Sequence, residues 1–369
     1  MRIGILTFHR ALNYGAVLQC YALCEVLKGM GHDVEIIDYR PTCIEKERWT
    51  FYGKTFIKKP LGEKVKSLLL IPFRFFSKHK ASKVFDAFMS KQFCYSNRVQ
   101  TPEDIPTDYD AIVFGSDQIW SPIICEEFNP IYYGCFAKGK TRFVCYAASL
   151  EGYKDFQTSE WDLIANRMKN FDAISVRELS FQKELSKHIN RTVEWVVDPT
   201  LLISPTVFEK MALKPAFKHY VFLFTVQGGD LPYQVAKKIA VERSTIIVRT
   251  RTSGRMNIAH RELGVINVDS VSPEMFIGLI RHAECIVTNS FHATAISLQL
   301  RKNFYAVECQ HPNRITDILK SLNLSSRYLT DANAISENEK IIDYDAVHEN
   351  LKRCVKKSYD YLLKNLQNE

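Results

Sequence analysis

The sequence has no apolar stretch long enough to cross a bilayer and no glycine-rich motif that binds nucleotide phosphates. Its longest apolar run, SLLLIPF, is far shorter than the roughly 20 residues of a membrane-spanning helix. The first predicted strand-to-helix turn, HRALNYGA, contains one glycine and so lacks a dinucleotide-binding fingerprint. The phosphate-loop lysine motif is also missing. These absences exclude a transmembrane helix and weigh against NAD or FAD.

Metal-binding patterns are missing as well. The ten cysteines are scattered, and Cys20 and Cys24, four apart on a predicted helix, are interpreted as buried small hydrophobes. No cluster of His, Asp and Glu stands at ligand spacing, so we expect no metal and no cofactor. Reduced thiols are favoured over a disulfide framework, and the sequence begins without a basic-then-apolar leader. We therefore expect a cytoplasmic protein.

The net charge of +8 is concentrated in one aromatic-rich segment. Residues 44–91 carry twelve Lys or Arg against four acidic residues, which accounts for the whole excess. Two interpretations stay open: a surface that contacts an anionic membrane or acceptor, or a solvated helical insertion with a buried apolar face. Nucleic acid is less attractive as a partner, because no recognised binding module accompanies the segment.

Strand and helix patterns alternate through the whole chain. Residues 2–8 and 32–39 are predicted strands around a helix at 16–28, which makes one βαβ unit. Further strands are expected at 111–115, 142–146, 173–176, 193–197, 219–226, 244–250, 264–269, 285–288 and 303–307. The predicted fold class is α/β, with two Rossmann-like domains that face each other across a cleft.

The predicted domains divide near residue 203. An N-terminal domain at 1–203 contains the basic insertion, and a C-terminal domain occupies 204–342. An amphipathic helix at 343–369 is expected to pack back on the N-terminal domain.

Polar residues gather where predicted strands end. Because the carboxyl ends of parallel strands share one edge of a sheet, we expect these residues to line the cleft. The candidates are Asn13 and Gly15, then Ser116 and Asp117, then Arg177, and finally Asn289, Ser290 and His292.

His292 falls in the first turn of a predicted helix, within the stretch NSFH. Free backbone N–H groups and the helix dipole favour an anion there, and histidine is suited to proton transfer. A structural role is the alternative for His292, and a helix N-cap is the alternative for Asn289 or Ser290. Three polar residues at one strand end inside a cleft favour a functional site.

Arg177 and Asp117 each have two interpretations. Arg177 could grip a carboxylate or phosphate, or form an ion pair with the adjacent Glu178. Asp117 could be a general base or a loop-forming side chain.

Six stretches occur in an order that resembles the polysaccharide pyruvyl transferase family. They are NYGAVLQCYAL, FGSDQIW, ISVRE, DPTLLI, SFHATAISL and NRITDILKSLNL, and they span roughly residues 1–330. The resemblance implies a fold like that of GT-B glycosyltransferases. It also implies phosphoenolpyruvate as the donor and a saccharide acceptor, free or lipid-linked, on which a pyruvate ketal forms.

The resemblance also implies roles for particular residues. His292 corresponds to the candidate general acid and Arg177 to a donor-binding arginine. Some members have Arg-Leu-His or Arg-Tyr-His where this chain has Ser290-Phe291-His292. Arg177 must therefore share the donor's charge with backbone amides or with another basic residue, for which Arg314 is our choice. The expected process is bacterial surface polysaccharide synthesis. The enzyme is expected in the cytoplasm, where it could also lie at the inner face of the cell membrane.

Two rival functions remain. One is a nucleotide-sugar glycosyltransferase on the same architecture, and the other is a non-catalytic glycan-binding protein. The second predicts that the polar residues at the strand ends can be changed without biochemical consequence.

Overall fold

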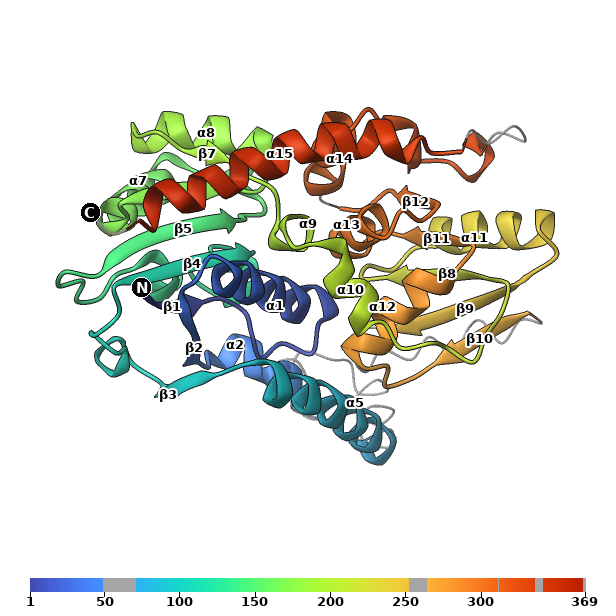
Figure 1. Cartoon of the computed structure of the whole chain (residues 1–369), viewed down its shortest axis with the longest axis horizontal. Coiled ribbons are helices and arrows are strands. Elements are labelled where there is room, and N and C mark those ends of the chain that lie inside the picture. The colour runs from blue at the N-terminus through green and yellow to red at the C-terminus, as the bar shows by residue number, and fades with distance from the viewer. Residues whose placement is uncertain (49–70, 252–263, 311, 336–340, 368–369) are drawn as a thin grey trace.

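The computed structural model describes residues 1–48, 71–251, 264–310, 312–335 and 341–367, and it shows two α/β domains side by side (Figure 1). Each domain is built on a parallel sheet with helices packed against it. The predicted fold class is confirmed.

The sheet of the N-terminal domain has the strand order β3-β2-β1-β4-β5-β6-β7 in the described residues. The strands are β1 Arg2–Leu6, β2 Asp33–Tyr39, β3 Tyr95–Val99, β4 Ala111–Asp117, β5 Arg142–Ala148, β6 Ala173–Val176 and β7 Glu194–Trp195. The helices are α1 Tyr14–Gly29, α2 Thr42–Glu45, α5 Ile71–Gln92, α6 Pro122–Cys125, α7 Thr158–Arg167 and α8 Leu179–Ile189. The strand order reverses between β1 and β4, and crevices for ligands open at such switch points.

The C-terminal domain repeats this design with the order β10-β9-β8-β11-β12-β13. Its strands are β8 Tyr220–Thr225, β9 Ile246–Arg251, β10 Val265–Val268, β11 Cys285–Thr288, β12 Phe304–Val307 and β13 Tyr328–Leu329. Its helices are α11 Leu231–Glu242, α12 Pro273–His282, α13 Phe291–Gln299 and α14 Asn313–Ser321. Here the strand order reverses between β8 and β11. Strand β11 leads directly into the stretch NSFH, residues 289–292.

Helix α1 lies between the two domains (Figure 1). Buried residues cover 13 of its 16 positions, because its far side packs on the C-terminal domain as well as on its own sheet. The Tyr14 ring stacks on Phe276 of α12 with ring centroids 4.2 Å apart, and its hydroxyl donates to the Val271 carbonyl. One hydrophobic core therefore runs through both domains and holds the cleft between them.

Three helices complete the link between the domains. The chain crosses through α9 Pro199–Leu202 and α10 Pro205–Met211, and it ends in α15 Tyr344–Asn365, which runs across both domains (Figure 1). In α15, Tyr361 donates a hydrogen bond to the Cys145 carbonyl, and Ser358 accepts one from the Val197 N–H. The C-terminal helix thus contacts strand β5 and the start of the crossover.

Some elements differ from the sequence prediction. Strand β3 is an edge strand with polar, largely exposed residues, so it lacks the apolar alternation of a half-buried strand. In the basic segment, residues 49–70 lie outside the described residues, whereas α5 is a helix that buries Phe85, Phe88 and Met89. The described part of the insertion therefore has the buried apolar face that the solvated-insertion interpretation expects, and its exposed face is left for either interpretation.

Candidate active site

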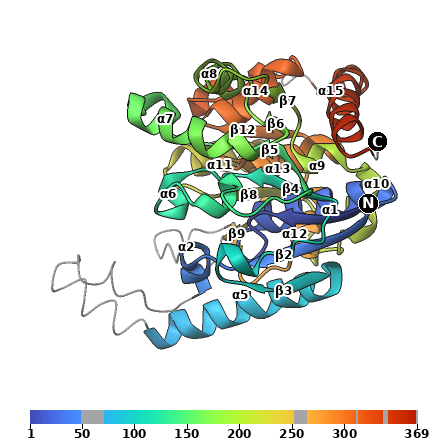
Figure 2. The same ribbon diagram turned by 90° about the vertical axis from the view of Figure 1, so that its left-hand side faces the viewer.

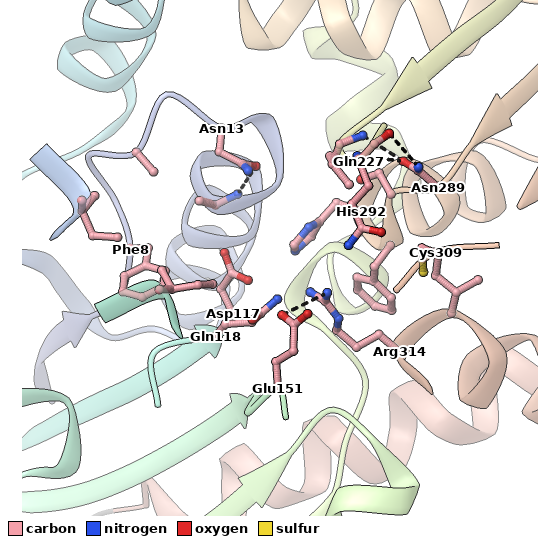
Figure 3. A pocket seen from close by; sticks show the side chains of 18 residues that line it. Phe8, Asn13, Asp117, Gln118, Glu151, Gln227, Asn289, His292, Cys309 and Arg314 are labelled. Carbon is pink, nitrogen blue, oxygen red and sulfur yellow. Dashed lines mark hydrogen bonds and ion pairs between the residues drawn. The ribbon is translucent and has the colours of Figure 1, made fainter. Parts of the chain in front are cut away.

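A pocket of about 270 Å³ lies where the carboxyl ends of the two sheets face each other (Figure 3). Both domains contribute to its wall. Six residues chosen from the sequence line it: Asn13, Asp117, Asn289, Ser290, His292 and Arg314. The fold brings them together from segments separated by up to 300 residues, because the two topological switch points face each other.

Two helices direct their N-termini at this pocket. Asn13 caps α1 by accepting hydrogen bonds from the N–H groups of Gly15 and Ala16, and Ser290 caps α13 by accepting one from Ala293. The unpaired N–H groups of each first turn and the positive dipole ends together favour an anion between them. Asn13 and Ser290 therefore act at least as helix caps.

His292 packs directly over Gly15 of the opposite domain. A Cβ atom at position 15 would lie 2.1 Å from His292 Nδ1, so only glycine leaves room for the imidazole. The other ring nitrogen, Nε2, lies 3.4 Å from Arg177 Nη1 and 3.6 Å from Asp198 Oδ2. Gly15 thus shapes the site through this close approach and does not line the pocket, and its role in substrate binding stays a prediction.

Arg177 lies behind the pocket wall and not along it. Its side chain is 1% exposed, its Nη1 donates to Asp198 Oδ2 at 2.7 Å, and its guanidinium stands over the Phe291 ring. Asp117 and Glu178 approach it at 3.7 and 3.5 Å. Buried carboxylates face the Arg177 guanidinium, which can orient His292. Its Nε and Nη2 donate no hydrogen bond within the described residues, and the predicted grip of Arg177 on an incoming anion stays a prediction.

Asp198 is the central buried carboxylate of the site, and the sequence analysis did not select it. It is fully buried and caps α9. Ser116, Arg177 and Thr200 all donate hydrogen bonds to it. Burial alone would raise the pKa of Asp198, but His292 and Arg177 hold that pKa well below its ordinary value. An Asp-Pro-Thr start of a helix was the available signal, and it indicates a cap rather than a site.

Ser116 has a supporting role as well. It is fully buried, does not line the pocket, and donates to Asp198. Its predicted contact with substrate stays a prediction. Asn289 does line the pocket, but its amide links the ends of two strands. It accepts from the Val226 N–H and donates to the Gln227 carbonyl.

The open part of the pocket wall carries charges of both signs. From the N-terminal domain come Asp117 and Glu151, and from the C-terminal domain come His292 and Arg314 (Figure 3). Arg314 Nη2 and Glu151 Oε2 are 3.7 Å apart across the cleft. Burial, and then repulsion from Arg177, lowers the pKa of Arg314 below its usual range. Among the described residues, Arg314 is the arginine that lines this pocket.

Glu151 and Gln118 also line the pocket, although the sequence analysis did not name them. Gln118 Oε1 is buried and accepts no hydrogen bond from the part of the chain that the structure describes. Glu151 follows β5 in a loop without a motif, so no local pattern pointed to it. Within the same described residues, no group of three or more His, Cys, Asp or Glu is placed to hold a metal ion. None of the described helices combines the length and apolar character that a membrane span requires.

Comparisons with known proteins bear on the fold and the family. No curated protein sequence matches the chain. A putative UDP-N-acetylglucosamine 2-epimerase from Listeria monocytogenes has a similar structure, with a TM-score of 0.51 and 9% identity over 99% of this chain and 91% of that one. The N-terminal domain of trehalose-6-phosphate phosphatase from Candida albicans has a TM-score of 0.50 and 10% identity over 99% and 98%.

The glycosyltransferase SnogD from Streptomyces nogalater matches with a TM-score of 0.43 and 12% identity over 98% and 95% of the two chains. The likenesses to the epimerase and to the phosphatase domain concern the fold, and the expected GT-B-like architecture is confirmed. A family model described as polysaccharide pyruvyl transferase matches residues 13–311. That range contains the pocket-lining residues of both domains except Phe8, Ala11, Arg314 and Ile315.

Proposed function

The chain belongs to the polysaccharide pyruvyl transferase family, and from this premise we propose that it transfers the pyruvate unit of phosphoenolpyruvate to a saccharide. Two hydroxyls of the acceptor would be bridged as a pyruvate ketal, with release of phosphate. The acceptor would be a bacterial surface polysaccharide or its lipid-linked precursor. Phosphoenolpyruvate is a substrate in this reaction, and the chemistry calls for no resident cofactor.

The observation that carries the proposal is the position of His292 between two helix N-termini and opposite Asp117. Phosphoenolpyruvate brings a carboxylate and a phosphate, and both need positive partners. The first-turn N–H groups of Phe291 and His292 in α13, the positive dipole ends of α1 and α13, and the guanidinium of Arg314 supply them at one place. The donor would displace Glu151 from Arg314, because a dianionic phosphate is the stronger partner.

The proposed mechanism begins with proton transfer. His292 gives a proton to C3 of the donor, and the π electrons that form this C–H bond leave C2 as an oxocarbenium-like electrophile. The first acceptor hydroxyl attacks C2 and gives its proton to Asp117. Arg177 Nη1 and Asp198 Oδ2 lie 3.4 and 3.6 Å from Nε2 and hold the imidazole from behind, which fixes its orientation.

The test of the proposed function is direct. We expect the purified protein, incubated with ¹³C-labelled phosphoenolpyruvate and a panel of lipid-linked saccharides, to release phosphate and to add one labelled pyruvate ketal to one acceptor. Mass spectrometry identifies the product, and the same panel offered with UDP- and GDP-sugars tests the glycosyltransferase rival. Glycosyl transfer without consumption of phosphoenolpyruvate would contradict the proposal.

We also propose that α5 contacts the anionic membrane that carries a lipid-linked acceptor. This helix runs along the outer edge of the molecule beside β2 and β3 (Figure 2). At its N-terminal half Phe75 and Phe76 are 51% and 70% exposed, and Lys80 and Lys83 stand exposed one turn further on. Exposed aromatic rings beside lysines are typical of a surface that binds lipid headgroups.

Replacing Lys80 and Lys83 with Gln should weaken binding to vesicles that contain phosphatidylserine by about tenfold, because each lysine near such a surface contributes roughly 1 kcal/mol before salt screening. Sedimentation with vesicles at two salt concentrations measures the effect. Lys352→Gln combined with Lys356→Gln on the exposed face of α15 is the matched control. If the parent protein does not sediment with these vesicles, the membrane contact is wrong.

A further inference from the structure

The pocket offers two carboxylates to the acceptor, and they lie in different surroundings. Asp117 shares the Arg177 guanidinium with His292, at 3.7 and 3.4 Å respectively. Glu151 instead faces Arg314, at 3.7 Å. Figure 3 shows Asp117, Glu151, His292 and Arg314 pointing toward the same space. One carboxylate therefore stands on the side of the general acid, and the other stands beside the arginine that would hold the donor.

Ketal formation needs two proton transfers that take place at different positions around the same carbon. Two hydroxyls attack the same carbon in succession, and each must lose a proton. One of the two protons replaces the proton that C3 gained, and the other leaves with inorganic phosphate. A base placed beside His292 suits the first transfer. The second transfer needs a base placed beside the departing phosphate.

We propose that Glu151 is the second catalytic base, which closes the ketal ring; this inference rests on the proposed function. After the first attack, the C2–O bond to phosphate breaks and its electron pair leaves with the phosphate. The second hydroxyl forms the new C2–O bond and gives its proton to Glu151, which passes it to the phosphate held by Arg314. Asp117 returns the first proton to His292, so the protein ends in its starting state and all protons are balanced.

The other carboxylates near the pocket are not placed for this step. Asp198 is fully buried, and three neighbouring residues donate hydrogen bonds to it. Glu178 is 2% exposed and accepts from the Ser149 hydroxyl. Neither lines the pocket, whereas Asp117 and Glu151 do. Among the carboxylates of the described residues, these two alone reach the pocket space.

The ion pair with Arg314 makes the role of Glu151 depend on the donor. While Glu151 faces Arg314, its charge is engaged and a hydroxyl gains little from it. Once phosphate occupies Arg314, Glu151 can accept a hydrogen bond from the acceptor. The donor is therefore expected to bind first.

The test compares Glu151→Gln with the parent protein and with Asp155→Asn, an exposed carboxylate in the loop that follows Glu151. Gln keeps the size of the side chain and a polar oxygen beside Arg314, but it cannot take a proton. Ketal formation should fall about tenfold to thirtyfold, because water and phosphate remain as weaker bases. Reactions quenched with base, in which a ketal phosphate persists, should contain an adduct with the mass of acceptor plus donor, which still carries phosphate.

Each outcome is decisive. An adduct in Glu151→Gln that is missing in the parent and in Asp155→Asn supports the second base, and Glu151→Asp should partly restore ring closure. Ketal formation within twofold of the parent, without adduct, would overturn this inference and leave the proposed function intact. A parent protein that consumes no phosphoenolpyruvate with any acceptor would overturn the proposed function and this inference with it. A melting temperature for each variant separates loss of folding from loss of chemistry.

Discussion

Replacing His292 with asparagine is expected to lower turnover by about two to four orders of magnitude, the usual effect of removing a positioned general acid. Asparagine can still donate a hydrogen bond, but it cannot protonate C3 of the donor. Affinity for phosphoenolpyruvate should change little, because Arg314, the first-turn N–H groups of α13 and the positive dipole ends of α1 and α13 remain.

The rival explanation is that His292 serves packing. It is 8% exposed and fills the space above Gly15, so a packing role predicts a lower melting temperature and nearly normal turnover per folded molecule. Melting temperature, donor affinity and turnover are therefore measured on one preparation. His282→Asn, at an exposed histidine at the end of α12, is the matched control. A well-folded His292→Asn protein with near-normal turnover would exclude the proposed mechanism.

The second large effect is expected at Asp198, where asparagine should lower the free energy of unfolding by about 3 kcal/mol. Breaking a buried ion pair by removing one partner leaves the other charge buried, which costs roughly 3–5 kcal/mol. The lower end applies here because Asp117 and Glu178 still face Arg177. Chemical denaturation at about pH 7 measures the difference, with Asp155→Asn as an exposed control.

The pH dependence of this difference has a definite sign. Because the pKa of Asp198 in the folded protein lies below its ordinary value of 3.8, the carboxylate stabilises the fold above that pH. The stabilisation is lost as the pH falls from there through the folded-state pKa. The difference in the free energy of unfolding between the parent and Asp198→Asn should therefore be largest at neutral pH and should shrink in strong acid. Equal stabilities at neutral pH would show that the buried network contributes nothing.

The sequence determined the elements and the caps, because both depend on neighbours along the chain. Apolar runs and helical spacing predicted β11 and α13 closely, and the polar residues between them were expected at the carboxyl end of a strand. The positions of Ser290 and Asn13 at helix starts could be predicted for the same reason, since the side chain of an N-cap accepts a hydrogen bond from the N–H group two or three residues further along the chain. The prediction failed for β3, whose pairing with β2 and not its own pattern makes it a strand.

The tertiary structure alone decided which charges meet. Arg177 and His292 are 115 residues apart, and no local pattern shows that Asp198 lies between their side chains. The same holds for Glu151 and Arg314, which face each other only because the two domains pack through α1 and the helices of the opposite domain. Electrostatic effects depend on distance and burial, and both are set by this packing. The sequence therefore showed where polar groups leave the strands, and the packing of the domains decided which of them reach the pocket.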